Sequence, residues 1–508
     1  MNEKLDKFFK ISERGSNLRT EVIGGLTTFF AMSYIVFTNP NQITSFFNPA
    51  NGGPMAKIWY ATYVASILVA VIGTLLMALY ARMPFAQACG MGLNSFFFVS
   101  FILPAVLTGG DTIKGYQEGL CIILLSGVLF MVLSLTGARS YIAKALPDNL
   151  KKAIPAGIGL FIAFIGFKNV GIIQANQYTF VQFFDFHGIF NSVGETLTSL
   201  KASGASSAII SSFEGVLNYD PLRVITGLDA WRVAAPVILA ILGLVTMAVL
   251  SKKNVKGSVI ITILGTSVLY YLLTWQAPSF DFGSIGESFK AFGEIGFIGA
   301  FKGFTVFSGG ASAIINAIVL VITFSLVDMF DTIGTLYGAA AQADMIDENG
   351  DPFELDKCMH SDSIATVTGA VLGTSTCTTF VESAAGVGAG ARTGFASLVT
   401  AACFALCLFL TPLALIIPAC ATAPALIYVG VLMLKGFAKV DMEDITSAIP
   451  AFLALIMMPL TYSISNGIAI GAIAYVIIAL ITGKYTKKDI PVTVIAILFG
   501  LRFALVSM

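Results

Sequence analysis

The chain has 508 residues, of which 56% are hydrophobic and 11% are charged. Soluble proteins carry about 25% charged residues, so this composition excludes an ordinary water-soluble fold and predicts a polytopic protein of the lipid bilayer. Lys and Arg number 29, as do Asp and Glu, so no basic excess is present to bind nucleic acid. The seven cysteines lack paired spacing, so we expect no disulfide framework and no metal site.

Apolar runs between turn signals predict fourteen membrane spans. Four of the runs are too short to cross about 30 Å of hydrocarbon as straight helices, so we expect them to be buried or broken. These four are 91–104, 362–373, 381–391 and 423–435. The predicted spans in chain order are 21–39, 59–80, 91–104, 116–137, 152–169, 233–250, 257–274, 313–340, 362–373, 381–391, 394–411, 423–435, 446–462 and 466–483.

The segments outside these spans are predicted from their polarity and charge. Residues 171–231 and 276–311 are expected to form external loops, the first with short interfacial helices, and neither resembles a separate folded domain. The last apolar run, 490–508, suits either a fifteenth span or a helix lying against the protein, and Arg502 favours the second. Lys and Arg gather in the short segments on the side of the N-terminus, which predicts a multi-pass protein of the cell (cytoplasmic) membrane with a cytoplasmic N-terminus.

The two halves of the chain resemble each other at one position. FAQACGMGLNSFFF (85–98) and STCTTFVESAAG (375–386) each combine a short strand-like run with the start of a Gly/Ala-rich helix. With seven spans in each half, the repeats would be inverted in the membrane. Discontinuous segments at matching positions of inverted repeats indicate a substrate site near the membrane midplane.

Three acids inside predicted spans are candidates for this site, because acids are costly in a membrane and are functional there by default. Asp328 and Asp331 lie three residues apart on one helical face, with Thr335 one turn beyond Asp331. Glu382 opens the Gly/Ala-rich helix, where a carboxylate can meet the free amides of a half-helix. The alternatives are that one Asp supports helix packing and that Glu382 is an ordinary N-cap.

The first half of the chain is expected to supply the wall of the substrate site opposite these acids. Gly92 would let backbone approach a ligand closely, and the Asn94 amide offers one acceptor and two donors. Close helix packing is the alternative explanation of such a glycine. Phe380, which could stack on a planar ligand, and Val381 directly precede Glu382, and we place both at the substrate site.

The residues also indicate how coupling to an ion gradient would work. The two histidines, His187 and His360, fall in predicted loops, so a proton relay would have to use carboxylates. Two acids in a poorly solvated site repel each other when both are ionised, which favours the uptake of a proton by one of them. A site built on Asp328 and Glu382 therefore takes a proton and a substrate together. Na⁺ would use the same oxygens, and the choice between the two ions stays open.

Three segments together resemble a known family. FAQACGMGLNSFFF (85–98), FSLVDMFDTIGTLYGAA (324–340) and TSTCTTFVESAAGVGAGARTGFASLV (374–399) are similar to the AzgA-like branch of the nucleobase:cation symporter-2 family, the adenine/guanine/hypoxanthine permeases. The opening FFKISERGSNLRTEVIGGLTTFFAMSYIVFTNP (8–40) resembles the same branch. The resemblance runs from about residue 10 to the end of the chain. One departure is Asn94-Ser95, where the family more often has Asn-Ala.

The resemblance implies an all-α polytopic fold of the uracil-permease type. Its fourteen segments would form two inverted seven-helix repeats, with core and gate domains and short strands in the third and tenth segments. Spans 1–4 and 8–11 would form the core, and spans 5–7 and 12–14 the gate. The implied divisions are a cytoplasmic N-terminal segment (1–20), the first repeat (21–274), an external loop (275–312), the second repeat (313–483) and a C-terminal apolar helix (484–508).

The implied activity is proton symport of purine nucleobases by an elevator-type carrier, not an enzyme, without a cofactor and with a homodimer as an expected assembly. The family's substrate-binding residues fall on Gly92, Asn94, Asp328 and Glu382, with Asp331 supporting. We assign proton coupling or its support to Asp328, Asp331, Glu382 and Thr335. The alternative is a carrier of the same fold for a pyrimidine, xanthine or urate, or an anion, although three acids at the site disfavour an anion. An intramembrane aspartyl protease is disfavoured because Asp328 and Asp331 share one helix.

Overall fold

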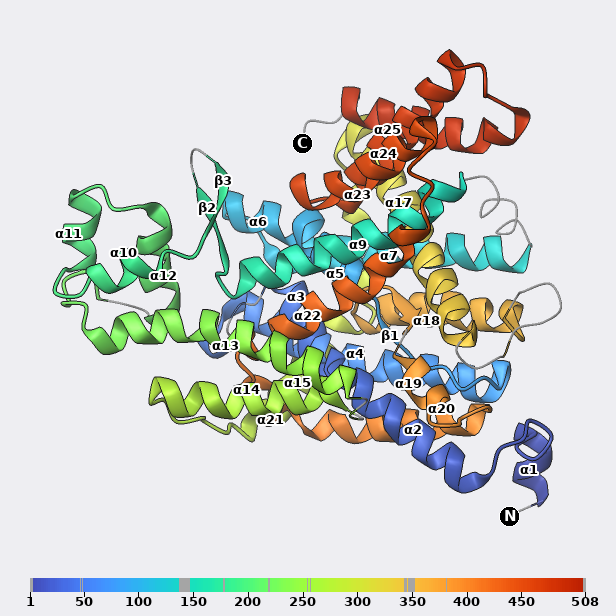
Figure 1. Ribbon diagram of the computed structural model, residues 1–508, viewed down its shortest axis with the longest axis horizontal. Helices are drawn as coiled ribbons and strands as arrows, with labels where there is room; N and C mark the ends of the chain where they lie inside the picture. The colour runs from blue at the N-terminus through green and yellow to red at the C-terminus, as the bar shows by residue number, and fades with distance from the viewer. Residues whose placement is uncertain are drawn as a thin grey trace. The chain divides into compact units, whose positions relative to one another are not determined.

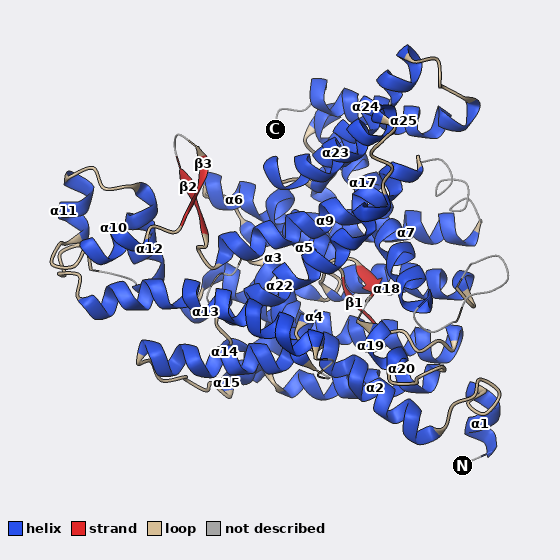
Figure 2. Ribbon diagram, in the orientation of Figure 1, coloured by secondary structure: helices blue, strands red, loops and turns tan. Residues whose placement is uncertain are grey.

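The computed structural model describes residues 3–45, 47, 49–136, 147–176, 179–217, 220–253, 255, 257–341, 345, 352–380 and 382–505. The chain is mostly helical, with two small two-stranded sheets in its described part (Figures 1 and 2). It divides into two compact units. The first comprises Met1–Ile162, Asp281–Ala414 and Gly430–Met508, and the second comprises Ala163–Phe280 and Leu415–Val429.

The elements of the first unit begin at the N-terminus and resume after residue 280. Helices α9, α21 and α22 each cross the boundary between the units. The elements are α1 (Glu3–Phe9), α2 (Leu18–Met32), α3 (Ile35–Ile43), η1 (Pro49–Asn51), α4 (Gly53–Leu76), η2 (Met77–Ala81), β1 (Gln87–Cys89), α5 (Met91–Phe97), η3 (Phe98–Ile102), α6 (Leu103–Thr108), α7 (Thr112–Leu135), α9 (Asp148–Asn169), α15 (Gly283–Ala291), η4 (Phe292–Gly296), α16 (Gly299–Lys302), η5 (Gly303–Phe307), α17 (Gly310–Ala341), α18 (Leu355–Leu372), β4 (Cys377–Thr379), α19 (Ser383–Gly388), α20 (Gly394–Leu406), η6 (Cys407–Phe409), α21 (Thr411–Leu415), α22 (Ala419–Leu434), η7 (Lys435–Lys439), α23 (Ile445–Leu460), α24 (Ile464–Ile481), η8 (Lys487–Asp489) and α25 (Ile490–Leu505).

Within the described residues, eight helical segments are long and apolar enough to cross a membrane. The chain is therefore a multi-pass membrane protein, as its composition predicts. The eight segments are Leu18–Ile43, Gly53–Ala81, Met91–Thr108, Thr112–Leu135, Asp148–Asn169, Gly227–Lys252, Gly310–Ile333 and Ala419–Lys439.

Three of the four runs that we expected to be short belong to longer helical segments, so the expected lengths were wrong for them. Helix α18 begins at Leu355, seven residues before the predicted start, because the polar stretch ahead of the apolar run is helical as well. Helix α22 likewise begins at Ala419 rather than at 423. The run at 381–391 forms only the short helix α19, and α5 continues through the π turn η3 into α6.

The strand-like runs in the two halves are strands, and they pair with each other. Strands β1 and β4 are antiparallel, with Gln87 opposite Thr379 and Cys89 opposite Cys377, and both strands are buried. Figure 2 shows β1 among the surrounding helices. The Gly90 N–H donates to the Thr376 carbonyl at 2.9 Å and the Phe380 N–H to the Ala86 carbonyl at 3.0 Å, which extends the ladder beyond both ends. The pairing therefore brings the two matching segments into direct contact.

The first apolar run is not one straight helix. It is interrupted at Ser33 and Tyr34 between α2 and α3, and Pro40 lies within α3. Beyond the break, α3 buries Asn39 and Gln42, which a lipid-facing helix would not carry. Ser33 and Tyr34 keep helical dihedral angles, so the interruption is local, and the polar residues of α3 lie in the protein interior.

Helix α2 packs closely on α19 and α20, and small residues permit the approach. A Cβ atom added at Gly386 would lie 2.0 Å from Thr28 Oγ1, so only glycine fits this contact. Below it, the buried Glu21 carboxylate accepts hydrogen bonds from the Arg392, Thr393 and Ala396 N–H groups and from the Thr393 hydroxyl, at 2.8 to 3.3 Å. Glu21 thus satisfies the free amides at the start of α20.

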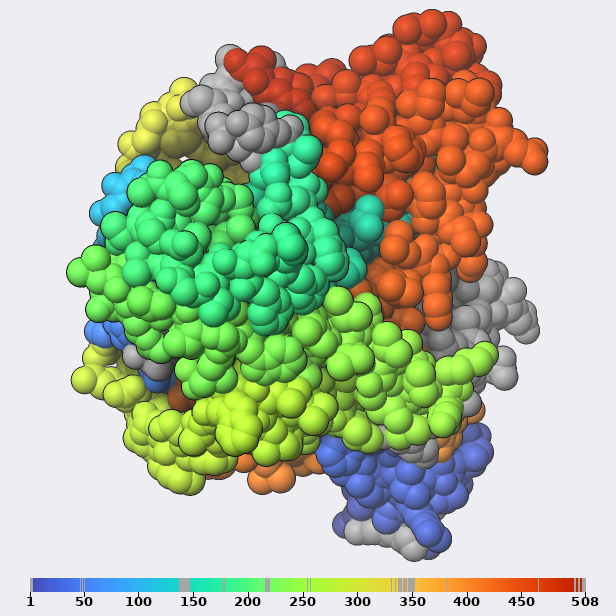
Figure 3. All heavy atoms as spheres, turned by 60° about the vertical axis from the view of Figure 1, so that its left-hand side comes forward, coloured from blue at the N-terminus to red at the C-terminus, as the bar shows by residue number. Residues whose placement is uncertain are grey.

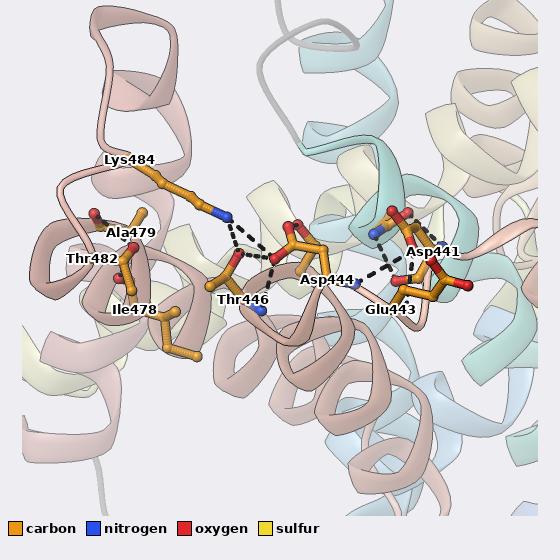
Figure 4. A network of polar contacts seen from close by, with 10 residues as sticks. Asp441, Glu443, Asp444, Thr446, Ile478, Ala479, Thr482 and Lys484 are labelled. Carbon is orange, nitrogen blue, oxygen red and sulfur yellow. Dashed lines mark hydrogen bonds and ion pairs between the residues drawn. The ribbon is translucent and has the colours of Figure 1, made fainter.

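Helices α23 and α24 form a hairpin whose ends are joined by a polar network, shown in Figure 4. Asp444 caps α23, and Lys484, just beyond α24, donates to Asp444 Oδ1 at 3.2 Å and to Thr446 Oγ1 at 3.1 Å. The hydroxyl of Thr446, the Lys484 ammonium and the hydroxyl of Ser447 lower the pKa of Asp444 to about 2. The final apolar run is the helix α25, which packs against α24 and α17.

The second unit contains the stretch expected as an external loop. It forms a hairpin of β2 (Ile173–Asn176) and β3 (Phe180–Phe183), followed by α10 (Phe186–Asn191), α11 (Leu197–Ala202) and α12 (Ser207–Leu217), and it continues into α13 (Gly227–Lys252) and α14 (Ser258–Thr274). The predicted short helices are confirmed. Phe184, Ile189, Leu197 and Phe213 share one apolar core with residues of α13. Figure 3 shows the segment, coloured teal to green, as one continuous mass.

Replacement of Glu21 by Ala is expected to lower the free energy of unfolding by about 3 kcal/mol, because several buried donors at the start of α20 lose their acceptor. Glu21→Gln keeps one acceptor oxygen and is expected to lose less. Denaturant unfolding of the purified protein in mixed micelles measures both values. Equal stability of wild type and Glu21→Ala would show that water or backbone rearrangement replaces the carboxylate.

Candidate functional site

The predicted acid Asp328 lies on α17 and is buried. The Thr366 hydroxyl of α18 donates to Asp328 Oδ2 at 2.7 Å and accepts a hydrogen bond from the Cys377 N–H of β4 at 3.1 Å. Within the described part of the chain, two oxygens are buried without a hydrogen-bond partner: Oδ1 of Asp328 and Oγ1 of Thr376, the residue before β4. Asp328 therefore holds two helices and a strand together and still has one open acceptor.

A second acid, Asp362 on α18, is bound in the reciprocal way. The Thr332 hydroxyl of α17 donates to Asp362 Oδ2 at 2.5 Å, and Thr332 Oγ1 lies 2.8 Å from Thr378 Oγ1 of β4. Gln87 Nε2 of β1 donates to Asp362 Oδ1 at 3.0 Å. Each of the two helices thus contributes one Asp and, four residues later, one Thr, and each Asp bonds to the Thr of the other helix.

Asp362 was missed in the sequence, where it stands at the edge of the predicted span 362–373. A signal for it is nevertheless present. DMFDT (328–332) and DSIAT (362–366) both place an Asp four residues before a Thr, which puts the two side chains on one helical face. Once α18 is extended to Leu355, Asp362 moves to the interior of a helix, where an acid is as unusual as Asp328.

Glu382 stands directly before α19, in the segment that follows β4. The Tyr34 hydroxyl, at the break between α2 and α3, donates to Glu382 Oε1 at 2.6 Å. The side chain makes no capping hydrogen bond to α19, so the alternative of an ordinary N-cap does not fit its geometry. Among the described residues its second oxygen has no hydrogen-bond partner, and the side chain is only half-buried.

Asp331 lies on α17, three residues after Asp328, and is also half-buried. Its carboxylate forms no hydrogen bond to the described residues. The hydroxyl of Thr335 bonds instead to the backbone carbonyl oxygens of Asp331 and Thr332, each at 3.0 Å. Thr335 therefore stabilises its own helix in this structure rather than contacting a carboxylate.

Asn94 on α5 is fully buried and all of its amide is engaged. Its Nδ2 donates to Asn39 Oδ1 at 2.5 Å and to Gln42 Oε1 at 3.1 Å, and its Oδ1 accepts from the Ser375 hydroxyl. Asn39 in turn donates to Thr374 Oγ1 at 3.1 Å and to the Ser66 hydroxyl. Sequence analysis did not identify Asn39 or Gln42, because Asn39 is the last residue of the predicted span 21–39 and Gln42 lies beyond its end.

The three remaining predicted site residues differ in what surrounds them. A Cβ atom at Gly92 would lie 2.4 Å from Ile158 Cγ2 of α9, so Gly92 permits close helix packing here. Phe380 is buried, and its N–H pairs with the β1 segment. Val381 lies outside the described residues.

Nearly all of these contacts converge on the segment from Thr374 to Glu382, which carries β4. Asp328 and Asp362 are connected to it through Thr366 and Thr332, and Glu382 is its last residue. No Lys, Arg or His of the described chain forms an ion pair with these acids or with Asp331. The described residues contain no His, Cys, Asp and Glu cluster suited to a metal ion. The arrangement presents carboxylate and hydroxyl oxygens, which accept hydrogen bonds from N–H groups and can bind a proton.

Comparison with known proteins identifies related chains over the whole length. The model of the Permease family matches residues 19–217 and 203–470. The chain is 38% identical to the guanine/hypoxanthine permease PbuG of Bacillus subtilis, over 94% of each chain. It is 33% identical to the adenine permease AdeQ of Escherichia coli, over 99% of this chain and 97% of that protein. It is also 35% identical to the putative permease MJ0326 of Methanocaldococcus jannaschii, over 99% of both.

Solved structures share the fold at low sequence identity. The transmembrane domain of the cyanobacterial bicarbonate transporter BicA superposes with a TM-score of 0.55 at 13% identity, covering 89% of this chain and 97% of that domain. SLC26A9 gives a TM-score of 0.55 at 12% identity, covering 92% of this chain and 66% of that one. The likeness establishes a shared fold.

Thr332→Val is expected to lower the free energy of unfolding by about 2 kcal/mol, because the isosteric side chain removes a hydrogen bond to the Asp362 carboxylate. Thr332→Ser keeps the hydroxyl and is the matched control, with stability expected near that of wild type. Unfolding of the purified variants in mixed micelles is the measurement. Valine and serine variants of equal stability would mean that the Thr332 hydroxyl contributes nothing to the packing of α17 on α18.

Proposed function

The chain belongs to the nucleobase permease family, in its AzgA-like branch, and on that premise we propose that it imports purine nucleobases with protons. The substrates are hypoxanthine, guanine and/or adenine, and the protein is a secondary active transporter, not an enzyme. The observation that carries the proposal is the group of acids around β4, which have no cationic partner among the described residues. An unpaired carboxylate is costly inside a membrane, and a proton removes that cost.

The proposed purine site uses the acceptors around the segment that follows β4. The open oxygen of Glu382 and the one bonded to Tyr34 can accept two parallel hydrogen bonds from the N1–H and amino group of guanine. Adenine presents its amino group and N9–H and needs a different pose. Asp328, Asn94, Gly92, Phe380 and Val381 complete the proposed contacts.

Proton coupling is assigned to the carboxylates and their support. Glu382 and Asp331 are half-buried, and each keeps carboxylate oxygens that no described residue uses, so either can accept a proton. Asp328 offers a buried open oxygen, and Thr335 holds the helix on which both Asp residues lie. No cofactor is required, because the gradient supplies the energy. Na⁺ would bind the same oxygens.

The proposed architecture is fourteen spans in two inverted seven-helix repeats, with the divisions at 1–20, 21–274, 275–312, 313–483 and 484–508. The antiparallel pairing of β1 with β4, each followed by a helix start, supports it, because a two-fold axis in the membrane plane produces such a pair. We further propose elevator-type movement of the core against the gate, a cytoplasmic N-terminus in the cell membrane, and a homodimer by analogy with the fold.

A carrier of the same fold for another solute is the second candidate, because BicA is described as a bicarbonate transporter. The acids around β4 disfavour an anion electrostatically. A pyrimidine or xanthine presents N–H groups to the same hydrogen-bond acceptors, whereas urate, an anion, is disfavoured with the other anions.

Uptake of labelled hypoxanthine, guanine, adenine, xanthine and uracil, by cells that lack their own carriers, tests the proposal directly. We expect accumulation of at least one purine and its loss when a protonophore is added. A sodium ionophore that abolishes uptake while the protonophore does not would assign coupling to Na⁺. Absence of purine uptake, with the protein present in the membrane, would overturn the substrate assignment.

Glu382→Gln is expected to reduce purine uptake by about 100-fold or more, because an amide cannot be ionised and offers one acceptor oxygen instead of two. Glu443→Gln is the matched control, since Glu443 is exposed at the approach to α23, and it should transport like wild type. Uptake is normalised to the amount of protein in the membrane. Normal uptake by Glu382→Gln would remove Glu382 from the mechanism.

A further inference from the structure

The β2–β3 hairpin of the second unit has two chemically different faces. In a strand, successive side chains point to opposite sides, so cross-strand pairs alternate between the two faces of the hairpin. One face carries the pairs Ile173 with Phe183 and Ala175 with Val181, and the other carries Gln174 with Gln182 and Asn176 with Phe180. Every residue of the first face is apolar, whereas three of the four residues on the second are amides.

The amide face is bonded within the protein. Gln174 Nε2 donates to the Ser212 hydroxyl of α12 at 2.9 Å, and Asn176 Nδ2 donates to Gln182 Oε1 at 2.5 Å. The bond from Gln174 attaches the amide face to α12, and the bond between Asn176 and Gln182 joins the two strands. On the apolar face, Ile173 packs against the core of the segment, and Val181 and Phe183 lie toward the outside.

The part of the apolar face formed by β3 is uncovered. Val181 is 46% exposed and Phe183 is 59% exposed, whereas Ile173 on β2 is partly buried. The Phe183 ring lies 6.2 Å from the ring of Phe186, which extends the aromatic surface to the first residue of α10. Figure 2 shows the hairpin of β2 and β3 next to α12 in the same segment.

The position of the hairpin along the chain places it at the membrane surface. The hairpin begins four residues after α9 ends at Asn169, and the whole segment returns to the membrane with α13 at Gly227. Both ends of the segment therefore lie at one face of the bilayer. Residues 170–184 contain no charged side chain, whereas the rest of the segment carries the ion pairs Lys201–Glu214 and Arg223–Asp229.

We propose that the β2–β3 hairpin lies on the lipid bilayer and inserts its apolar face, with Phe183 and Val181, at the boundary between headgroups and acyl chains. Aromatic side chains are enriched at this depth, and a polar opposite face is what an interfacial element requires. The hairpin anchors the segment between α9 and α13 to the lipid beside these two spans. This role is independent of the transported substrate.

A second copy of the chain is less suited than the lipid bilayer to cover this face. A stable protein interface buries about 800 Å² on each partner, and such interfaces include polar groups at their rim. The apolar face of a hairpin with four residues in each strand offers only a fraction of that area. Its chemistry, without charge and rich in aromatic and aliphatic groups, is that of the bilayer interface.

A fluorescent label at single introduced cysteines tests the proposal. Val181→Cys and Phe183→Cys are each labelled with an environment-sensitive nitrobenzoxadiazole group, and the full chain is reconstituted in vesicles of phosphatidylethanolamine and phosphatidylglycerol. The control is Ala202→Cys, at the exposed end of α11. Wild-type protein treated with the same reagent gives the background from its own seven cysteines.

We expect blue-shifted emission at positions 181 and 183, and quenching by lipids with a nitroxide on the acyl chain that is several-fold stronger than at position 202. Labels at 181 and 183 that are as accessible to a water-soluble quencher as the label at 202 would overturn the proposal. Labels that are shielded from water but not quenched by nitroxide lipids would also overturn it, because a protein surface would then cover the face.

Discussion

The structure depends on one electrostatic constraint: acids are buried in the interior of a membrane protein without a cation beside them. Taking an ionised carboxylate out of water costs several kcal/mol unless partners replace the water. In the described chain those partners are hydroxyls and amides, from Thr366 for Asp328, from Thr332 and Gln87 for Asp362, and from Tyr34 for Glu382. These neutral donors can stabilise a charge without cancelling it, so the acids remain available to a mobile cation.

The strand pair and its surrounding helices follow from this constraint. A Thr hydroxyl that donates to a carboxylate still has lone pairs, and Thr366 and Thr332 use them to accept from β4. The acids therefore fix the strand through the same hydroxyls that stabilise them, and the reciprocal Asp and Thr pairs fix α17 against α18. Strand β4 in turn pairs with β1, which carries Gln87, a donor to Asp362. The polar interior is one connected network, and such networks specify a unique packing when their members are satisfied.

Composition and motif spacing predicted the membrane class, the family and the two strand-like runs, because these depend on local sequence. The strands were found because a short run precedes a helix start at matching positions of both halves, and in the second half this run is rich in threonine. The features that could not be predicted depend on contacts between residues that are far apart in the sequence. Tyr34 and Asn39 lie in a run apolar enough to be one helix, and nothing in that run shows a break at Ser33. Asp362 was overlooked because the edge of a span was set by hydropathy, which treats the polar first turns of α18 as a loop. Gly92 was assigned to a ligand approach, while in the structure Ile158, more than sixty residues away, occupies the space beside it.

The polar groups fall into two sets, according to whether their polar atoms already have hydrogen-bond partners within the described chain. Asn94 and Asp362 are buried, with their polar atoms committed to neighbours, so their first effect is to set the geometry of α3, α5, α17 and α18. Glu382 and Asp331 are half-buried and retain acceptors that no described residue uses, so they can meet a solute or a proton without first breaking a bond. Asp328 lies between the two sets, with one oxygen bonded to Thr366 and one open. In the proposed carrier, a base that bound to Asn94 would have to replace the hydrogen bond of Asn94 to Ser375 or to Asn39. Loss of these bonds would release the residues that precede β4. Binding at Glu382 and rearrangement at Asn94 are therefore linked through the same strand.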